Sequence, residues 1–163
     1  MEIGKRFNPR YIFFGLYFIA FFAYIVVGLQ PAEATNYNIS TKLVIPSIEL
    51  DSDVATLKME NHQLSTPDTI VGSYSSSDNK TMLIGHSSTV FNHLNEVSLG
   101  DEIIYDDAKY VVKEREILAK EDVIMPKLLS ASNEKTIVIM TCAGEDLGKG
   151  DATHRLILTA IKL

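Results

Sequence analysis

The chain has 163 residues, a hydrophobic fraction of 46%, a formal net charge of −6 and one cysteine. That length allows one domain with its own core, and the apolar fraction excludes an intrinsically disordered chain. A single cysteine excludes an internal disulfide framework and zinc sites of the Cys₄ and Cys₂His₂ types. The acidic balance argues against nonspecific binding to nucleic acid, which needs clustered lysine and arginine.

An uncharged apolar run at residues 11–29 predicts a membrane-spanning helix. At 1.5 Å per residue this run covers about 28 Å, close to the ~30 Å hydrocarbon thickness of a bilayer. Lys5, Arg6 and Arg10 precede the run. The positive-inside rule therefore places residues 1–10 in the cytoplasm and the chain after the run outside the cell.

A cleaved signal peptide is the rival interpretation of this region, because Ala32-Glu33-Ala34 resembles a cleavage site. The apolar run is longer than the usual hydrophobic region of a signal peptide, which has about 7–15 residues. We therefore expect a retained single-pass anchor in the cell membrane. A linker at residues 30–40 and an extracellular domain at residues 41–163 would follow it.

Short β-rich runs separated by turns dominate the expected domain, which favours an all-β sandwich or barrel. The expected strands are residues 42–45, 54–58, 81–84, 102–105, 109–114, 135–142 and 155–163. The last two are apolar on both faces, so we expect them to be central. Residues 75–79 read as a polar loop, and residues 89–94 and 126–130 as short helices.

Cys142 stands where an apolar strand gives way to the polar segment at residues 143–146. Free cysteine is among the most buried residue types, so a core position is one interpretation. A place at the end of a strand, and an unpaired thiol expected outside the cell, favour a nucleophile instead. Antiparallel pairing of the two strongest strands, joined by a link at residues 143–154, would bring Cys142 near Arg155.

His86 is the first candidate for an acid or base, because it follows an apolar strand and Gly85 before it permits a close backbone approach. Alone, such a histidine is more often an ordinary loop residue. His93 is a second candidate for the same region. A zinc site that combines these histidines with His154 and Cys142 lacks a close ligand pair such as His-x-x-x-His, so we do not expect one.

Four segments of the expected domain carry a resemblance to a known family. They are Ile45-Pro46-Ser47-Ile48, then Ile84-Gly85-His86 with the downstream segments 90–94 and 99–103, then Thr141-Cys142, and finally Arg155-Leu156-Ile157-Leu158. In this order they resemble the opening strand, the histidine segment, the nucleophile motif and the closing strand of the sortases. Sortases are transpeptidases that attach surface proteins on Gram-positive bacteria. The segments assign no subclass.

The resemblance implies a closed eight-stranded β-barrel with short helices and a role for each matching residue. Cys142 would cleave a C-terminal sorting signal resembling Leu-Pro-x-Thr-Gly and hold the acyl chain as a thioester. His86 would give a proton to the leaving amine. Arg155 would hold substrate carbonyls and stabilise the oxyanion. Thr141 would be a substrate-binding residue that lines the site.

The resemblance also implies the partners of the reaction. They would be proteins with a sorting signal and an amine acceptor, either a cell-wall precursor or a pilin lysine, with no nucleic acid. No cofactor or metal is expected, since the acidic residues form no recognisable calcium loop. Two alternatives stay open: a cysteine hydrolase that releases the acyl chain to water, and a membrane-tethered binding module without turnover. An intact set of Cys142, His86 and Arg155 argues against the second.

Overall fold

The computed structural model describes residues 37–59, 64–148 and 150–163. The expected cytoplasmic tail, the anchor at residues 11–29 and most of the linker lie outside these residues. Within the described part of the chain, no helix combines the length and the apolar character that a membrane crossing requires.

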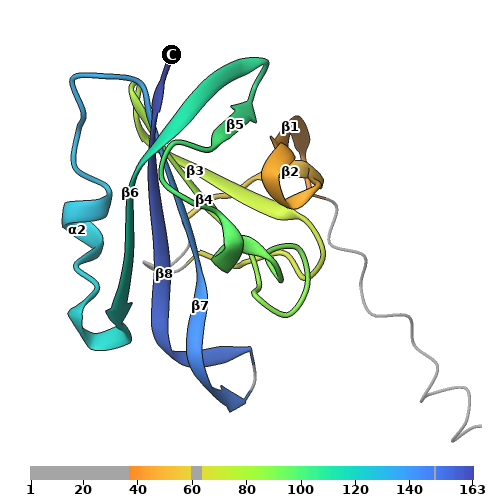
Figure 1. Ribbon diagram of the computed structural model, residues 1–163, viewed down its shortest axis with the longest axis vertical. Helices are drawn as coiled ribbons and strands as arrows, with labels where there is room; N and C mark the ends of the chain where they lie inside the picture. Colours follow the sequence, from red (N-terminus) through yellow and green to blue (C-terminus); the bar gives the residue numbers. More distant parts are fainter. Residues whose placement is uncertain (1–36, 60–63, 149) are drawn as a thin grey trace, which may run out of the picture. The chain divides into compact units, whose positions relative to one another are not determined.

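Eight strands in the described residues form one closed barrel (Figure 1). They are β1 (Ile39–Ile45), β2 (Leu50–Thr56), β3 (Val71–Ser77), β4 (Lys80–Ile84), β5 (Glu102–Tyr105), β6 (Ala108–Ala119), β7 (Thr136–Gly148) and β8 (Asp151–Lys162). The order around the barrel is β1-β2-β3-β4-β7-β8-β6-β5, and pairing of β1 with β5 closes it. The predicted all-β barrel is confirmed.

In the described residues, four short helical segments connect the strands. They are η1 (Pro46–Ile48), η2 (Leu94–Glu96), η3 (Lys120–Asp122) and α2 (Met125–Leu128). The predicted helical turn near residues 126–130 corresponds to α2. The helix predicted at residues 89–94 was wrong, because these residues form successive turns that end in η2.

Strand β3 was missed in the sequence, where residues 75–79 read as a loop. Residues 75–77 belong to β3, and only residues 78–79 turn the chain into β4. The strand forms because it pairs on both sides, parallel with β2 and antiparallel with β4. Ser73 is buried there, and its hydroxyl donates to the carbonyl of Ala55 at 3.3 Å.

The two strands expected to be central, β7 and β8, pair antiparallel and lie between β4 and β6. The link expected at residues 143–154 was wrong in extent, since β7 continues to Gly148 and β8 begins at Asp151. The resulting hairpin runs past the body of the barrel in Figure 1. The part of the hairpin nearer the barrel carries Cys142 and Arg155.

Alternate residues of β4 and β7 face two separate apolar regions, which explains why these strands are apolar on both faces. Inward-facing Leu83, Ile137 and Ile139 join the barrel core. On the outer face, Met82 and Ile84 belong to a second cluster that packs against Leu64, Met125, Leu129 and Met140. The segment before β3 and the β6–β7 connection with α2 therefore build a wall over the outer face.

Candidate active site

Cys142 and Arg155 are direct cross-strand partners in the β7–β8 pair. Directly opposite residues of an antiparallel pair share one face of the sheet, with Cβ atoms about 4.5–5.5 Å apart. The face in question is the outer one, because Cys142 lies two residues beyond Met140 on β7. The predicted neighbourhood of thiol and guanidinium thus follows from backbone register.

His86 follows β4, which pairs with β7 on the side opposite β8, so His86 and Arg155 flank Cys142. Strands β4 and β7 are parallel, and their register pairs Ile84 with Met140. The same offset, continued by two residues, sets His86 beside Cys142. Thr141 strengthens this alignment, since its hydroxyl donates to the carbonyl oxygen of Gly85 at 2.8 Å.

Gly85 fits here because its neighbours leave no room for a side chain. A Cβ atom at this position would lie 2.6 Å from Val90 Cγ1 and 2.8 Å from Phe91 Cδ2. Phe91 is part of the core, so the chain after β4 packs closely against the barrel before it reaches His86. The close backbone approach expected for this glycine is present.

A hollow of about 340 Å³ brings the candidates together at the outer face of the barrel. Its lining includes the thiol-bearing, imidazole-bearing and guanidinium-bearing residues Cys142, His86 and Arg155. Most of the remaining lining is apolar, namely Met59, Leu64, Met82, Ile84, Met125, Leu129 and Met140. The polar groups therefore sit at one end of an apolar groove.

Gly150, at the start of the β8 side of the hairpin, lies close to both Cys142 and His86. The Cys142 thiol donates to the Gly150 carbonyl oxygen, with an Sγ to oxygen distance of 3.4 Å. A Cβ atom on Gly150 would lie 3.5 Å from two atoms of the His86 ring. The hairpin end thus forms one rim of the hollow, a contribution that the sequence did not reveal.

The His86 side chain is 28% exposed and has a weakly held acidic neighbour. Its Nε2 atom lies 4.0 Å from Asp68 Oδ1, and the Asp68 side chain is 97% exposed. A pair at this distance with an exposed carboxylate contributes little energy, so Asp68 holds the ring only weakly.

The Arg155 side chain is only 15% exposed, and its guanidinium is engaged on one side. Nη2 donates to Asp151 Oδ1 at 2.6 Å, while Nη1 donates to two backbone carbonyls. Asp151 also accepts a hydrogen bond from Lys120 of η3. Hydrogen bonds from Lys120 and Arg155 lower the pKa of Asp151 to about 2. Neither Asp151 nor Lys120 was singled out from the sequence.

A second hollow, of about 400 Å³, also borders Cys142. It shares Thr141 and Cys142 with the first hollow, and its other lining residues come from β6, β7, β8 and the segment after β4. The lining is neutral, with Ser87, Asn92 and Asn95 as polar members. Cys142 therefore borders two hollows.

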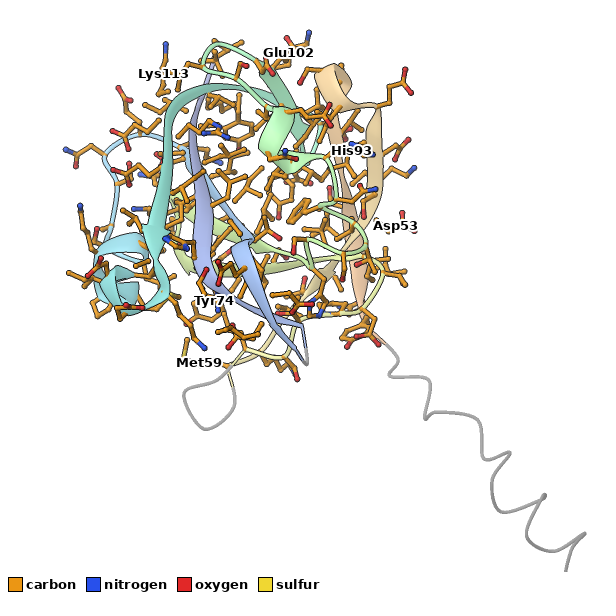
Figure 2. The ribbon with its side chains drawn as sticks, turned by 60° about the horizontal axis from the view of Figure 1, so that its bottom comes forward. Asp53, Met59, Tyr74, His93, Glu102 and Lys113 are labelled. Carbon is orange, nitrogen blue, oxygen red and sulfur yellow. The ribbon has the colours of Figure 1, made fainter. Side chains whose placement is uncertain are left out.

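The second histidine candidate, His93, does not join the site. Its Nδ1 atom lies 2.7 Å from Glu96 Oε1, and His93 lines neither hollow beside the thiol. Figure 2 shows it well separated from Met59, which lines the first hollow. His154 is also absent from both linings and contacts Thr153 instead.

In residues 37–59, 64–148 and 150–163, no three His, Cys, Asp or Glu side chains form a group that could hold a metal ion. The site instead offers a thiol nucleophile, an imidazole for proton transfer and a guanidinium for negative charge. That combination suits acyl transfer through a thioester.

The family model of the sortase domain matches residues 43–162. No curated protein matches the chain significantly by sequence.

Solved structures with a similar fold include a lid mutant of sortase A from Corynebacterium diphtheriae, with 20% identity, a TM-score of 0.60, and coverage of 80% of this chain and 73% of that one. Sortase C-1 from Actinomyces oris has 19% identity, a TM-score of 0.58 and 82% coverage of both chains. Sortase A from Listeria monocytogenes has 17% identity, a TM-score of 0.59, and coverage of 77% of this chain and 87% of that one.

Proposed function

The chain belongs to the sortase family, and from this premise we propose that it is a membrane-anchored cysteine transpeptidase. It would cleave a C-terminal sorting signal resembling Leu-Pro-x-Thr-Gly and pass the acyl chain to an amine. The single observation that carries the proposal is that Cys142 of β7, its cross-strand partner Arg155 of β8 and His86, just after β4, line one mostly apolar hollow.

The first half of the reaction makes a thioester. The Cys142 sulfur, as thiolate, attacks the scissile carbonyl carbon, and the carbonyl oxygen becomes an oxyanion. Arg155 supplies N–H donors to that oxygen. His86 gives its proton to the nitrogen of the departing segment, so that the peptide bond breaks and a free amine leaves.

The second half reverses these roles. An incoming amine attacks the thioester carbon, His86 takes the proton from its nitrogen, and the thiolate of Cys142 leaves. The product holds a new amide bond, and the enzyme returns to its starting state. The apolar lining of the first hollow supports binding of the apolar residues in a sorting signal.

The acceptor would be a cell-wall precursor or a pilin lysine, and the second hollow beside Cys142 leaves space for an amine to approach. The anchor at residues 11–29 would hold the domain at the outer face of the cell membrane, near such acceptors. The apolar run and its basic flank support this location.

Mass spectrometry of an acyl-enzyme tests the proposal. Full-length protein is incubated with a peptide that contains Leu-Pro-Glu-Thr-Gly, with and without triglycine. We expect a mass adduct on Cys142 that hydroxylamine removes, and a peptide–triglycine product when the amine is present. Cys142→Ala is the control and should give neither.

The same experiment separates the alternatives. Release of the acid in preference to the triglycine product would indicate a hydrolase. Normal turnover by Cys142→Ala would end the proposal, and tight binding of sorting peptides by the wild type without an adduct would favour a binding module.

A further inference from the structure

The contacts of Arg155 leave part of its guanidinium available. Such a group has five N–H donors. Two on Nη1 are used by the carbonyls of Ala152 and His154, at 2.8 Å each, and one on Nη2 is used by Asp151 at 2.6 Å. The other Nη2 donor and the Nε donor have no hydrogen-bond partner in the described part of the chain. Two donors thus remain for a ligand.

The carboxylate that engages Arg155 is itself fixed from a second direction. Asp151 accepts from Lys120, which lies on η3 at the end of β6 and not on the β7–β8 hairpin. One carboxylate oxygen of Asp151 therefore pairs with Lys120 and the other with Arg155. Because both cations lower its pKa to about 2, Asp151 is ionised near neutral pH.

Asp151 lies outside the hollow, whereas Arg155 lines it. Asp151 contacts the lining of the hollow through its ion pair with Arg155. A free arginine side chain has many rotamers, and a guanidinium stabilises an oxyanion well only if its donors are oriented before the charge develops. An ion pair that immobilises one side of the group provides this orientation.

We propose that Asp151, held by Lys120, is a positioning residue that orients the guanidinium of Arg155 and leaves its two free donors for the carbonyl oxygen of the scissile bond. The proposal rests on the proposed function, because the oxygen in question is that of a sorting peptide. It adds two residues that touch no substrate.

The test compares kcat/KM of full-length variants on a fluorogenic Leu-Pro-Glu-Thr-Gly peptide. We expect Asp151→Asn to lose about 10- to 100-fold, less than the ~10²–10³-fold typical of a lost direct donor. The loss should fall mainly on kcat. Asp151→Glu should recover most of the activity, and Lys120→Met should show a smaller loss than Asp151→Asn.

Asp51→Asn is the matched control, since it removes a carboxylate from an exposed ion pair with Lys42 that lies outside both hollows beside Cys142. Its activity should equal that of the wild type. In an Arg155→Ala background, Asp151→Asn should change the residual rate by less than about twofold, because residues that act as one unit are not additive.

Three outcomes would overturn the proposal. Equal activity of wild type and Asp151→Asn would remove the positioning role. Higher activity of Asp151→Asn would mean that Asp151 holds Arg155 away from the substrate. An equal loss in both the Arg155 and Arg155→Ala backgrounds would mean a general structural effect.

A measurement without turnover keeps this test separate from the proposed function. The Arg155 Nε–H resonance can be assigned in a ¹⁵N-labelled protein by its loss in Arg155→Lys. We expect it to shift and broaden in Asp151→Asn and to stay in place in Asp51→Asn. If the wild type lacks activity on the peptide, the proposed function fails alone. An unchanged resonance in Asp151→Asn contradicts the positioning role.

Discussion

Thr141 contributes a hydroxyl group whose hydrogen bond ties β7 to the chain just after β4. The residue is 4% exposed, and the hydroxyl donates to the Gly85 carbonyl. We expected Thr141 to line the substrate site, and it does line both hollows beside the thiol. The hydrogen bond gives Thr141 a second role, because this bond fixes the register of β7 that sets Cys142 beside His86.

Thr141→Val tests that task, because valine keeps the shape and removes the hydroxyl. The buried Gly85 carbonyl then loses its partner, which should lower the free energy of unfolding by about 1–3 kcal/mol. Thr141→Ser keeps the hydroxyl and serves as the control. Urea unfolding measures the free energy of unfolding of both variants. The peptide assay should show a larger loss of kcat/KM for Thr141→Val than for Thr141→Ser. A valine variant as stable and active as the serine variant would contradict this role.

The ion pairs of Asp151 also predict an acid dependence of stability. Its pKa falls from 3.8 to about 2 in the folded chain. A carboxyl with a lowered folded pKa contributes stability that is complete above its unfolded pKa and is lost as pH falls towards the folded one. The contribution should therefore disappear between about pH 4 and pH 2.

Urea unfolding of wild type and Asp151→Asn across this range checks the acid dependence. We expect the wild type to be more stable at pH 6 and the difference to shrink as pH falls from about 4 to 2. A difference that stays constant down to pH 2 would show that the carboxylate charge is not its cause.

At the scale of elements, the outer part of the β7–β8 hairpin depends on glycines with positive φ. Gly144 has φ +81°, and a Cβ atom there would lie 2.5 Å from Thr153 Oγ1 and 2.7 Å from His154 Nδ1. Gly148 has nearly the same φ, +80°, but nothing lies within 4 Å of a Cβ atom. The two positions separate backbone strain from side-chain crowding.

Gly144→Ala should therefore destabilise the protein more than Gly148→Ala. The left-handed conformation costs both variants about 1–2 kcal/mol. Crowding against Thr153 and His154 should add about 1–3 kcal/mol for Gly144 alone. Thermal unfolding of both variants measures the difference. Equal melting temperatures would show that the hairpin moves to accommodate the extra carbon.

The elements differ in how well sequence patterns predict them. The two long apolar strands and their pairing were predictable, because hydrophobic residues on both faces require a central place in a sheet. Strand β3 was not predictable, since Val71 is followed by Gly72 and four serines interrupted only by Tyr74, a composition that resembles a loop. Its pairing with β2 and β4, and not its own propensity, makes it a strand.

The same distinction applies to the site. Cys142 and Arg155 lie within β7 and β8, and the predicted antiparallel pairing of these strands was enough to bring them together. His86 follows β4 by two residues, and only the family resemblance assigned it to the same site. The bond between Lys120 and Asp151 joins residues 31 positions apart and depends on the path of the β6–β7 connection. No local pattern encodes that path, which is why Asp151 escaped notice in the sequence.

At the scale of the whole molecule, the proposed reaction requires the barrel to face the acceptor amine outside the cell. Residues 11–29 are uncharged and Lys5, Arg6 and Arg10 precede them. A basic flank is retained on the cytoplasmic side during insertion, so the domain that follows should be exported. In the proposed topology, Lys5, Arg6 and Arg10 would set the orientation of the chain.

Protease accessibility in intact cells tests this orientation. With epitope tags at both ends, added protease should remove the C-terminal tag and spare the N-terminal one, while a cytoplasmic marker protein stays intact. Replacement of Lys5, Arg6 and Arg10 by Glu should reduce the digested fraction, because the charge asymmetry that sets the orientation is lost. A mature chain that begins near Thr35 would support the cleaved signal peptide instead. Protection of the C-terminal tag until the membrane is opened would place the barrel inside the cell, where the proposed acceptors cannot reach Cys142.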